Sequence, residues 1–258
     1  MLKIIHTTVL ALVLSLPSFA DAETVLITGS NRGIGLGLTE AYADRGWRVI
    51  ATARNPAKAD ELNTLADKYD NLTVDELDVT DDGEIAALAS KYEGTAIDVL
   101  LNNAGVLGDI EKQNAQNIDY DEIKFIMDVN VYGPMKMAKA FLPHVAASEQ
   151  KKILTMTSGL GSMTLTQRLG RFYGYRMSKA AVNMAMRAIH ADLKGKGYVI
   201  GLIAPGQVQT ELLFASGFRG PGSITVDESV AGLMTVIDNI NADTVGLPIN
   251  YNGEAIPW

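Results

Sequence analysis

Residues 24–35 read Thr24-Val25-Leu26-Ile27-Thr28-Gly29-Ser30-Asn31-Arg32-Gly33-Ile34-Gly35, an apolar run followed by a turn of the form TGxxxGxG. The apolar run predicts a buried strand over 24–27, and residues 33–45 predict a helix. Glycines in this turn let the backbone bend sharply and approach a pyrophosphate, an anion that a helix N-terminus also favours. We interpret residues 28–35 as a dinucleotide-binding turn; the alternative is an ordinary glycine-rich turn without a ligand.

Apolar and amphipathic segments alternate along the rest of the chain. The expected strands are 48–51, 72–77, 97–101, 152–156 and 198–203, and the expected helices are 58–68, 82–92, 118–142, bent near Gly133-Pro134, and 175–193. Strands that alternate with helices form a parallel sheet covered on both faces. The predicted fold class is therefore α/β, a Rossmann-type doubly wound parallel sheet in a single domain over 23–258, with a mobile loop at 212–225.

Composition excludes several classes of function. The 258 residues are 47% hydrophobic and 20% charged, which is enough for a substantial core. The net charge is −8, and an acidic chain repels the phosphates of nucleic acids. There are no cysteines, so disulfides, thiolate metal sites and cysteine nucleophiles are excluded. His6, His144 and His190 are far apart in the sequence, and we expect no metal site.

Tyr175 and Lys179 stand four residues apart in an expected helix and therefore share one face of it. An ammonium group beside a phenol stabilises the phenolate and lowers the pKa of the phenol from its ordinary value of about 10. This pair predicts a proton donor; the alternative is a tyrosine that packs at a helix start with a wet tip. Tyr173 is a rival phenol, but the residue four positions later is Met177.

The end of the second expected strand indicates the choice of cofactor. An acidic residue there would bind the ribose hydroxyls of NAD(H), whereas this chain has Thr52-Ala53-Arg54. The guanidinium group of Arg54 suits a 2′-phosphate, and Arg32 is expected on the other side of that phosphate. We predict NADP(H); the alternative is that Arg54 is a solvated loop residue.

Five ordered motifs resemble the short-chain dehydrogenase/reductase family over nearly all of residues 23–258. They are TGxxxGxG at 28–35, Asn102-Asn103-Ala104-Gly105, Asn130, Tyr175-x-x-x-Lys179 and Pro205-Gly206-Gln207-Val208-Gln209-Thr210. The wording YRMSK and the ending Pro257-Trp258 are similar to the carbonyl-reductase-like branch that includes sniffer and C-factor proteins.

The resemblance implies a catalytic set of Asn130, Ser158, Tyr175 and Lys179. It also implies that Asp78 faces the adenine, that Thr210 binds the carboxamide side of the nicotinamide, and that Lys179 holds the ribose. Together with the turn and Arg54, the expected cofactor contacts are Gly29, Ser30, Asn31, Arg32, Gly33, Ile34, Gly35, Arg54, Asp78, Val79, Asn102, Ala104, Gly105, Tyr175, Lys179, Pro205, Gly206, Val208 and Thr210.

Two serines compete for the catalytic position. Ser158 matches the motif at the end of the fifth expected strand, but it lies further before Tyr175 than is usual in the family, and Ser162 has the usual spacing. We favour Ser158, because the end of a strand fixes a side chain more rigidly than a loop does. The loop 159–174 can absorb a short insertion.

The resemblance implies hydride transfer between a nicotinamide and a carbonyl or alcohol carbon. Tyr175 would act as general acid or base, Ser158 would hydrogen-bond the substrate oxygen, and Asn130 would hold a water that links Lys179 to solvent. Alternatively, Asn130 merely satisfies a broken helix. The rival function is a dinucleotide-binding sensor or signalling protein with little or no turnover.

The expected substrate is a small carbonyl or alcohol compound of apolar character. This follows from the apolar residues of the loops that would shape the pocket, which are Leu107, Leu212, Leu213, Phe214 and Phe218. The family resemblance also implies a homodimer or a homotetramer.

The N-terminus resembles a signal peptide over residues 1–22. Lys3 precedes a mostly apolar stretch, Pro17 ends that stretch, and Ala20-Asp21-Ala22 fits a small-x-small cleavage pattern. The alternative is an uncleaved, loosely attached helix. A cleaved leader predicts a periplasmic or exported protein; a cytoplasmic location is the alternative, because NADPH supply outside the cytoplasm is doubtful.

Overall fold

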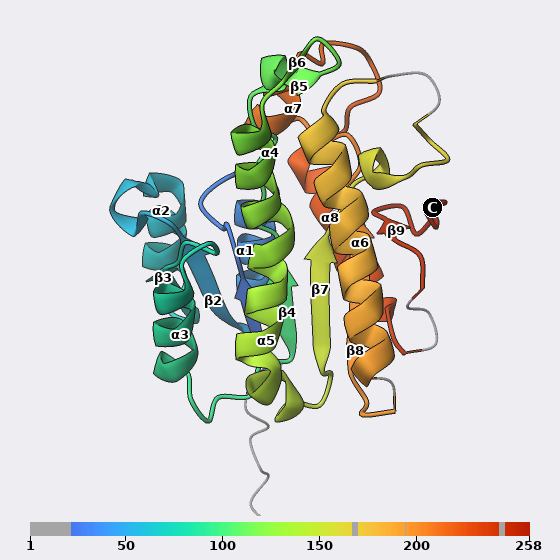
Figure 1. Cartoon of the computed structure of the whole chain (residues 1–258). Coiled ribbons are helices and arrows are strands. Elements are labelled where there is room, and N and C mark those ends of the chain that lie inside the picture. Colours follow the sequence, from blue (N-terminus) through green and yellow to red (C-terminus); the bar gives the residue numbers. More distant parts are fainter. Residues whose placement is uncertain (1–21, 167–169, 194, 243–245) are drawn as a thin grey trace, which may run out of the picture.

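In the computed structural model, which describes residues 22–166, 170–193, 195–242 and 246–258, seven strands form one parallel sheet (Figure 1). In chain order the strands are β1 (Thr24–Ile27), β2 (Arg48–Ala53), β3 (Leu72–Glu76), β4 (Val99–Asn102), β7 (Lys152–Met156), β8 (Val199–Ala204) and β9 (Ile249–Asn250). Their order in the sheet is β3-β2-β1-β4-β7-β8-β9. The order reverses between β1 and β4, and ligands of such sheets bind at the carboxyl ends of the strands at that point.

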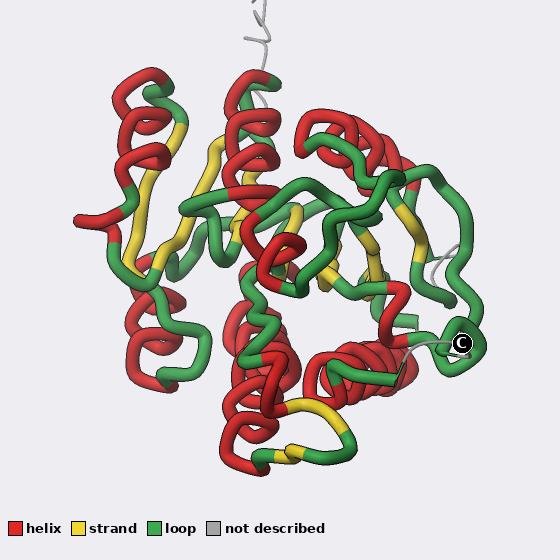
Figure 2. The backbone as a smooth tube through the Cα atoms, turned by 90° about the horizontal axis from the view of Figure 1, so that it is seen from above, coloured by secondary structure: helices red, strands yellow, loops and turns green. Residues whose placement is uncertain are grey.

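Helices cover both faces of this sheet (Figure 2). One face carries α1 (Gly33–Asp44), α2 (Asp60–Lys68) and α8 (Val226–Asn239), and the other carries α3 (Asp82–Lys91), α5 (Gly133–Ala146) and α6 (Tyr173–Leu193). Successive strand residues point to opposite faces, so Val25 and Ile27 join the first core and Leu26 joins the second. The predicted fold class, a doubly wound parallel sheet in a single domain, is confirmed.

Helix α8 packs directly on α1, and both helices lie on the first face of the sheet. Gly37 allows the close approach, because a Cβ at this position would lie 2.9 Å from Cγ2 of Val230. At the amino end of the sheet, Arg45 pairs with Asp238 at 3.0 Å. The last helix and the first helix are therefore neighbours.

The single helix predicted over 118–142 is wrong in its details. Residues before it form a small antiparallel pair, β5 (Gln113–Asn114) and β6 (Asn117–Ile118). Helix α4 (Tyr120–Met127) then starts where the Asp119 side chain accepts hydrogen bonds from the first turn. It passes into α5 through a π-helical turn, η3 (Asp128–Tyr132), rather than a bend at Gly133-Pro134.

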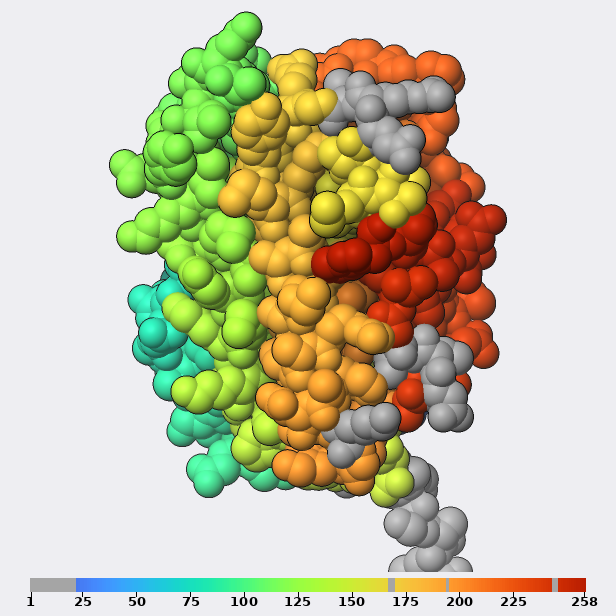
Figure 3. All heavy atoms as spheres, turned by 45° about the vertical axis from the view of Figure 1, so that its right-hand side comes forward, coloured from blue at the N-terminus to red at the C-terminus, as the bar shows by residue number. Residues whose placement is uncertain are grey.

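The region after β8 is more ordered than the loop predicted at 212–225. It contains a short helix, α7 (Glu211–Ala215), which Thr210 caps, and it leads into α8. Neither α8 nor β9 is among the predicted elements. After β9 the chain lies against the segment that follows β7, where the Thr164 N–H donates to the Trp258 carbonyl at 3.2 Å (Figure 3).

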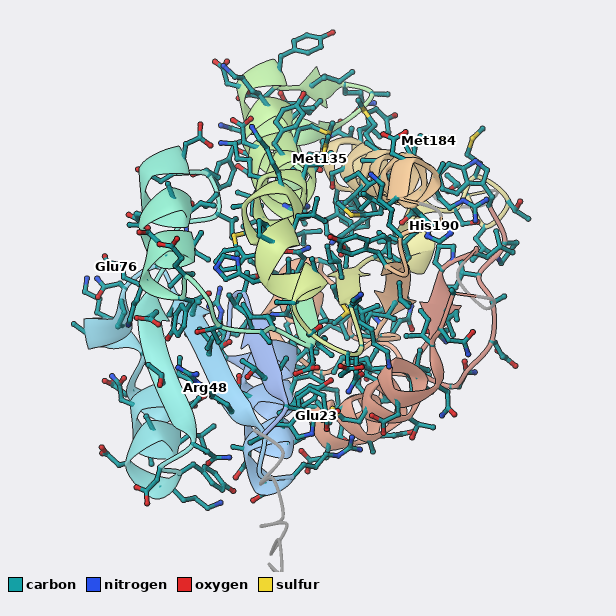
Figure 4. The ribbon with its side chains drawn as sticks, turned by 90° about the horizontal axis from the view of Figure 1, so that it is seen from below. Glu23, Arg48, Glu76, Met135, Met184 and His190 are labelled. Atoms are coloured by element: carbon teal, nitrogen blue, oxygen red, sulfur yellow. The ribbon has the colours of Figure 1, made fainter. Side chains whose placement is uncertain are left out.

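Two of the three methionines in the middle of α6 lie on the surface. Met186 is buried, but Met177 and Met184 are more than half exposed on α6. Figure 4 shows Met184 there and Met135 on α5. The predicted leader, residues 1–22, lies outside the described residues except for Ala22. None of the described helices combines the length and the apolar character that crossing a membrane requires.

Candidate active site

The glycine-rich turn after β1 is anchored to the segment that follows β4. Thr28 Oγ1 accepts hydrogen bonds from the backbone N–H groups of Asn103 and Ala104, both at 3.0 Å. The Asn103 side chain donates to the carbonyls of Thr28 (2.9 Å) and Gly29 (3.0 Å). The structure therefore brings together the expected cofactor contacts from residues 28–35 and 102–105, at the point where the strand order reverses.

The glycines of this turn have no room for side chains. Gly29 and Gly33 have positive φ angles of 69° and 56°, which glycine adopts without strain. A Cβ on Gly35 would lie only 2.2 Å from the Gly29 carbonyl oxygen. Arg32, the residue before α1, makes no side-chain capping hydrogen bond, and the first turn of α1 has no acidic residue. The start of α1 therefore has no side-chain cap, and it follows a glycine-rich turn. This arrangement fits the pyrophosphate of a dinucleotide.

The two arginines that were expected to flank a 2′-phosphate have different surroundings. Arg54 follows β2 and is exposed, and the Ser30 N–H donates to the Thr52 carbonyl at 2.8 Å, so the end of β2 adjoins the turn. Arg32 forms an ion pair with Glu211 at the start of α7. Among the described residues no ion pair involves Arg54. Arg54 is therefore the guanidinium group left for a phosphate.

The expected contacts after β3 and β4 have unequal surroundings. Asp78 Oδ1 accepts hydrogen bonds from the backbone and the hydroxyl of Thr80, at 2.8 and 2.7 Å. Val79 is 6% exposed and belongs to the core, which leaves mainly its backbone for a ligand. Asn102 donates to Thr155 Oγ1 at 3.3 Å, but its own Oδ1 is buried without a partner among the described residues. A buried orphan acceptor at the site is a group that a bound ligand or water would satisfy.

The segment Pro205–Thr210 after β8 meets the glycine-rich turn from the other side. Gly206 has a φ of 83° and packs against Tyr251, and the buried Val208 pairs with Ile224. The methyl group of Thr210 would lie 3.3 Å from a Cβ on Gly33. The Thr210 hydroxyl caps α7, which fixes this segment beside the turn.

Of the two candidate serines, Ser158 lies at Tyr175. Ser158 follows β7 and caps the short turn η4 (Gly159–Gly161), and its side chain is close enough to the Tyr175 phenol to act against the rise in the pKa of that phenol. Ser162 is 2% exposed, and its Oγ accepts a hydrogen bond from the Leu165 N–H at 3.2 Å. The end of the strand thus brings Ser158 to the phenol, and Ser162 is used within the loop.

Lys179 lies one turn after Tyr175 and is 5% exposed. Its Nζ donates to the Met156 carbonyl at 3.0 Å and is 5.5 Å from the centroid of the Tyr175 ring. A Cβ on Gly105 would lie 3.7 Å from Lys179 Nζ and 3.3 Å from Asn130 Oδ1. The segment after β4 therefore runs close to the lysine and the asparagine, and glycine makes that approach possible.

Asn130 lies in the π-helical turn η3 and holds the segment after β4 in place. Its Oδ1 accepts from the Val106 N–H at 2.9 Å, and its Nδ2 donates to the Val106 carbonyl (2.9 Å) and to Ser178 Oγ (3.0 Å). Both hydrogens of the Asn130 side-chain amide are therefore used in these hydrogen bonds. A water link to Lys179 would have to use the backbone carbonyl of Asn130 or the remaining lone pair of its Oδ1.

The electrostatics of the pair differ from the sequence-based expectation. Burial raises the pKa of Tyr175 to about 12, and only Ser158 works in the opposite direction. Burial also lowers the pKa of Lys179 to about 8. The predicted lowering of the phenol pKa by Lys179 is therefore wrong for the protein alone. The physical reason is that removal from water disfavours the charged form of both groups.

The lowered pKa of Lys179 makes the free energy of unfolding depend on pH. Between about pH 8, the pKa of Lys179 in the fold, and 10.5, its ordinary value, the unfolded chain binds the extra proton, so stability rises with pH. The opposite effect of Tyr175 begins only above pH 10. We expect Lys179→Met to reduce the rise in unfolding free energy from pH 7.5 to 9.5 by about 2 kcal/mol, measured by urea denaturation.

Lys152→Met is a parallel test of the same effect at a second buried lysine. Burial also lowers the pKa of Lys152, whose Nζ donates to the Ile237 carbonyl at the amino end of the sheet. Each substitution should remove part of the rise in unfolding free energy between pH 7.5 and 9.5. The double variant should remove more of this rise than either single variant. An unchanged pH dependence in Lys179→Met would show that the lysine is not desolvated.

Three polar residues at the site, the half-buried Asn103 and the buried Gln113 and Ser178, are absent from the sequence-predicted set. The Asn-Asn-Ala-Gly motif contained a signal for Asn103, which holds the glycine-rich turn. Ser178 Oγ donates to the Tyr175 carbonyl at 2.8 Å, and the Tyr175 N–H donates to Gln113 Oε1 at 3.0 Å. Neither has a sequence signal, because a partner across the fold cannot be identified from a single sequence.

A surface hollow of about 650 Å³ lies at the opposite, amino end of the sheet. Its lining includes Arg45, Lys152 and Asp238. The Arg45–Asp238 ion pair and the hydrogen bond from Lys152 to a carbonyl already compensate these charges. Among the described residues no group of three or more histidines and acids could hold a metal ion. The carboxyl end of the sheet is therefore the candidate site.

The chain is similar in sequence and in fold to several known proteins. The family model described as short chain dehydrogenase matches residues 23–216. The C-signal protein of Myxococcus xanthus is 36% identical over 169 residues, which are 63% of this chain and 93% of that protein. The NADPH-bound carbonyl reductase from chicken fatty liver superposes with a TM-score of 0.85 at 30% identity, covering 93% of this chain and all of that one. The carbonyl reductase Sniffer of D. melanogaster superposes with a TM-score of 0.82 at 27% identity, covering 92% and 100%.

Proposed function

The chain belongs to the short-chain dehydrogenase family, and from this premise we propose that it is an NADP(H)-dependent oxidoreductase that interconverts a carbonyl compound and an alcohol. One observation carries the proposal. The half-buried Ser158 and the buried Tyr175 and Lys179 lie together at the carboxyl end of the sheet, beside the turn that fits a dinucleotide. Bound NADP(H) would supply or accept the hydride at the substrate carbon.

Tyr175 is the proposed general acid and base. A phenol whose pKa is about 12 remains protonated at neutral pH, so burial holds Tyr175 in the form that can donate a proton to a carbonyl oxygen. The nearby Ser158 side chain favours the phenolate that remains after the transfer. Lys179, with a pKa of about 8, is mostly cationic at pH 7, and its Nζ lies 5.5 Å from the centroid of the Tyr175 ring.

Ser158 and Asn130 have supporting roles in this proposal. The Ser158 hydroxyl, already placed at the phenol, would also bind the substrate oxygen and stabilise its developing charge. Asn130 keeps the segment after β4 against α6 through its hydrogen bonds to Val106 and Ser178. These hydrogen bonds fix the position of the segment after β4 next to Lys179.

The proposed preference for NADP(H) rests on Arg54, and the NADPH-bound chicken carbonyl reductase supports it. A charge-assisted hydrogen bond contributes about 1.5–3 kcal/mol. We therefore expect Arg54→Ala to weaken NADPH binding by about 10- to 100-fold and to leave NADH binding unchanged. Fluorescence titration of the protein with each dinucleotide measures both affinities.

Arg48→Ala is the matched control for Arg54. Arg48 stands at the start of the same strand, at the amino end that Figure 4 shows, far from the proposed phosphate. It should leave both affinities as in the wild type. Equal NADPH affinity in Arg54→Ala and Arg48→Ala would remove the role given to Arg54.

An apolar carbonyl compound is the proposed substrate. Leu107 and Phe172 pack with the Tyr175 ring in a small buried cluster, and the expected wall residues Leu212 and Phe214 are exposed on α7. NADPH consumption across a panel of aldehydes and ketones of increasing apolar size tests this. The expected result is a kcat/KM that rises with apolar size; no turnover with any carbonyl would contradict the proposal.

The similarity to the C-signal protein favours one alternative, a dinucleotide-binding signalling protein with little turnover. This alternative predicts that NADPH binds without being consumed. It also predicts that the biological output of the protein is unchanged when the Tyr175 hydroxyl is removed. The same substrate panel therefore separates the two functions.

A further inference from the structure

Helix α6, which carries Tyr175 and Lys179, begins without a polar cap of its own. The first N–H groups of a helix lack partners within it, and a Ser, Thr, Asp or Asn side chain before the helix usually accepts from one of them. Here the preceding residue is Phe172, whose side chain has no acceptor. Arg171 and Phe172 have positive φ angles of 98° and 60°, a strained backbone that its surroundings must hold in place.

Gln113 supplies the missing acceptor from a distant part of the chain. Its Oε1 accepts a hydrogen bond from the Tyr175 N–H at 3.0 Å, across a sequence separation of 62 residues. Its Nε2 donates to the carbonyls of Leu107 (2.9 Å) and Asp109 (3.1 Å). The Gln113 side chain is 0% exposed. One buried amide therefore joins the start of α6 to the segment after β4.

Close packing around this amide leaves little freedom for the helix start. A Cβ on Gly174 would lie 2.8 Å from Cδ1 of Ile126 and 3.2 Å from Gln113 Oε1. Leu107, whose carbonyl Gln113 binds, packs with Phe172 and Tyr175. Gln113 thus fixes both the apolar wall beside the phenol and the backbone from which the phenol extends.

We propose that Gln113 is a positioning residue for Tyr175, which it holds through the backbone N–H in the first turn of α6. The inference rests on the role proposed for Tyr175. The Tyr175 hydroxyl must stay in place relative to Ser158 and the substrate, and a displacement of about 1 Å at a reacting group can lower a rate by about 100-fold. The amide prevents that displacement at the end of α6 where the tyrosine lies.

Gln113→Met tests this role, with Gln116→Met as the matched control. Methionine keeps the length of the side chain and removes its three hydrogen bonds, and Gln116 lies on the same hairpin with an exposed side chain. We expect Gln113→Met to lower kcat by about 10- to 100-fold, with unchanged NADPH affinity, and to speed amide hydrogen exchange over residues 172–177. Gln116→Met should match the wild type in all three measurements.

Gln113→Glu distinguishes positioning from a merely structural role. It keeps the shape and the acceptor for the Tyr175 N–H, but it loses both donations and adds a buried carboxylate near the phenol. Because a nearby negative charge disfavours the phenolate, the pKa seen in the pH profile of kcat/KM should move upward. A purely structural residue would lower the melting temperature and leave that pKa in place.

Two results would overturn the inference. The first is a folded Gln113→Met protein with the wild-type kcat and the wild-type rate of amide exchange over residues 172–177. The second is a Gln113→Glu protein with the wild-type kcat and the wild-type pH profile. The second result decides the question also when Gln113→Met does not fold. Failure of the proposed function gives a different pattern. In that case the wild type turns over no carbonyl, or Tyr175→Phe retains full activity, while Gln113→Met still speeds exchange over 172–177.

Discussion

Tyr175→Phe is expected to lower kcat/KM for carbonyl reduction by about 10²- to 10⁴-fold, the usual contribution of a general acid. The substitution removes only the hydroxyl; the ring, which packs with Leu107 and Phe172, remains. NADPH affinity should stay close to that of the wild type. Stability should change by only about 1 kcal/mol, the usual contribution of one hydrogen-bonding group, because only the hydroxyl is lost. The rate of NADPH consumption at saturating cofactor measures the effect.

Tyr173→Phe is the matched control for this substitution. Tyr173 lies two residues earlier in the same first turn of α6, and its side chain is only partly buried. It should keep the wild-type rate. If Tyr175→Phe keeps that rate as well, the proton comes from another group and the mechanism proposed for the cluster is wrong.

Gly35→Ala is expected to abolish NADPH binding at concentrations that saturate the wild type. The new methyl group would lie 2.2 Å from the Gly29 carbonyl oxygen and 2.5 Å from Nδ2 of Asn103. Asn103 donates to the Thr28 and Gly29 carbonyls, so the obstacle is a braced backbone rather than the end of a flexible side chain. The turn must shift or the protein must lose stability, and overpacking of this kind costs about 1–3 kcal/mol or more.

Gly170→Ala provides the comparison at a glycine where a Cβ would meet no atom within 4 Å. This variant should bind NADPH and melt as the wild type does. Titration with NADPH and thermal unfolding of both variants complete the test. Wild-type NADPH affinity in Gly35→Ala would mean that the turn is not packed as described and does not bind the pyrophosphate.

The parallel sheet could be predicted because its strands are short apolar runs bounded by turns, as in residues 24–27. What the sequence did not contain was the role of single polar residues at helix boundaries. Asp119 starts α4 at Tyr120, two residues after the predicted start at 118. The π-helical turn around Asn130 was also invisible, since its hydrogen-bond register depends on packing against α6 and the segment after β4.

At the candidate site, the residues that carry motifs could be proposed from the sequence, and the residues that hold them could not. Spacing alone left Ser158 and Ser162 in competition, and the structure separates them because η4 turns Ser162 into the loop. The phenol pKa was predicted in the wrong direction, since a sequence does not show how deeply Tyr175 and Lys179 are buried. Gln113 acts across 62 residues, a distance at which no local pattern exists.

The packing of α8 on α1 has a consequence for synthesis on the ribosome. Leu38 and Tyr42 of α1 are fully buried in the finished protein, yet the helix that covers their side of the sheet emerges only after residue 226. A nascent chain therefore carries uncovered apolar surface through most of its translation, a condition that promotes aggregation. We expect this protein to depend on chaperones until its last eighth has been made.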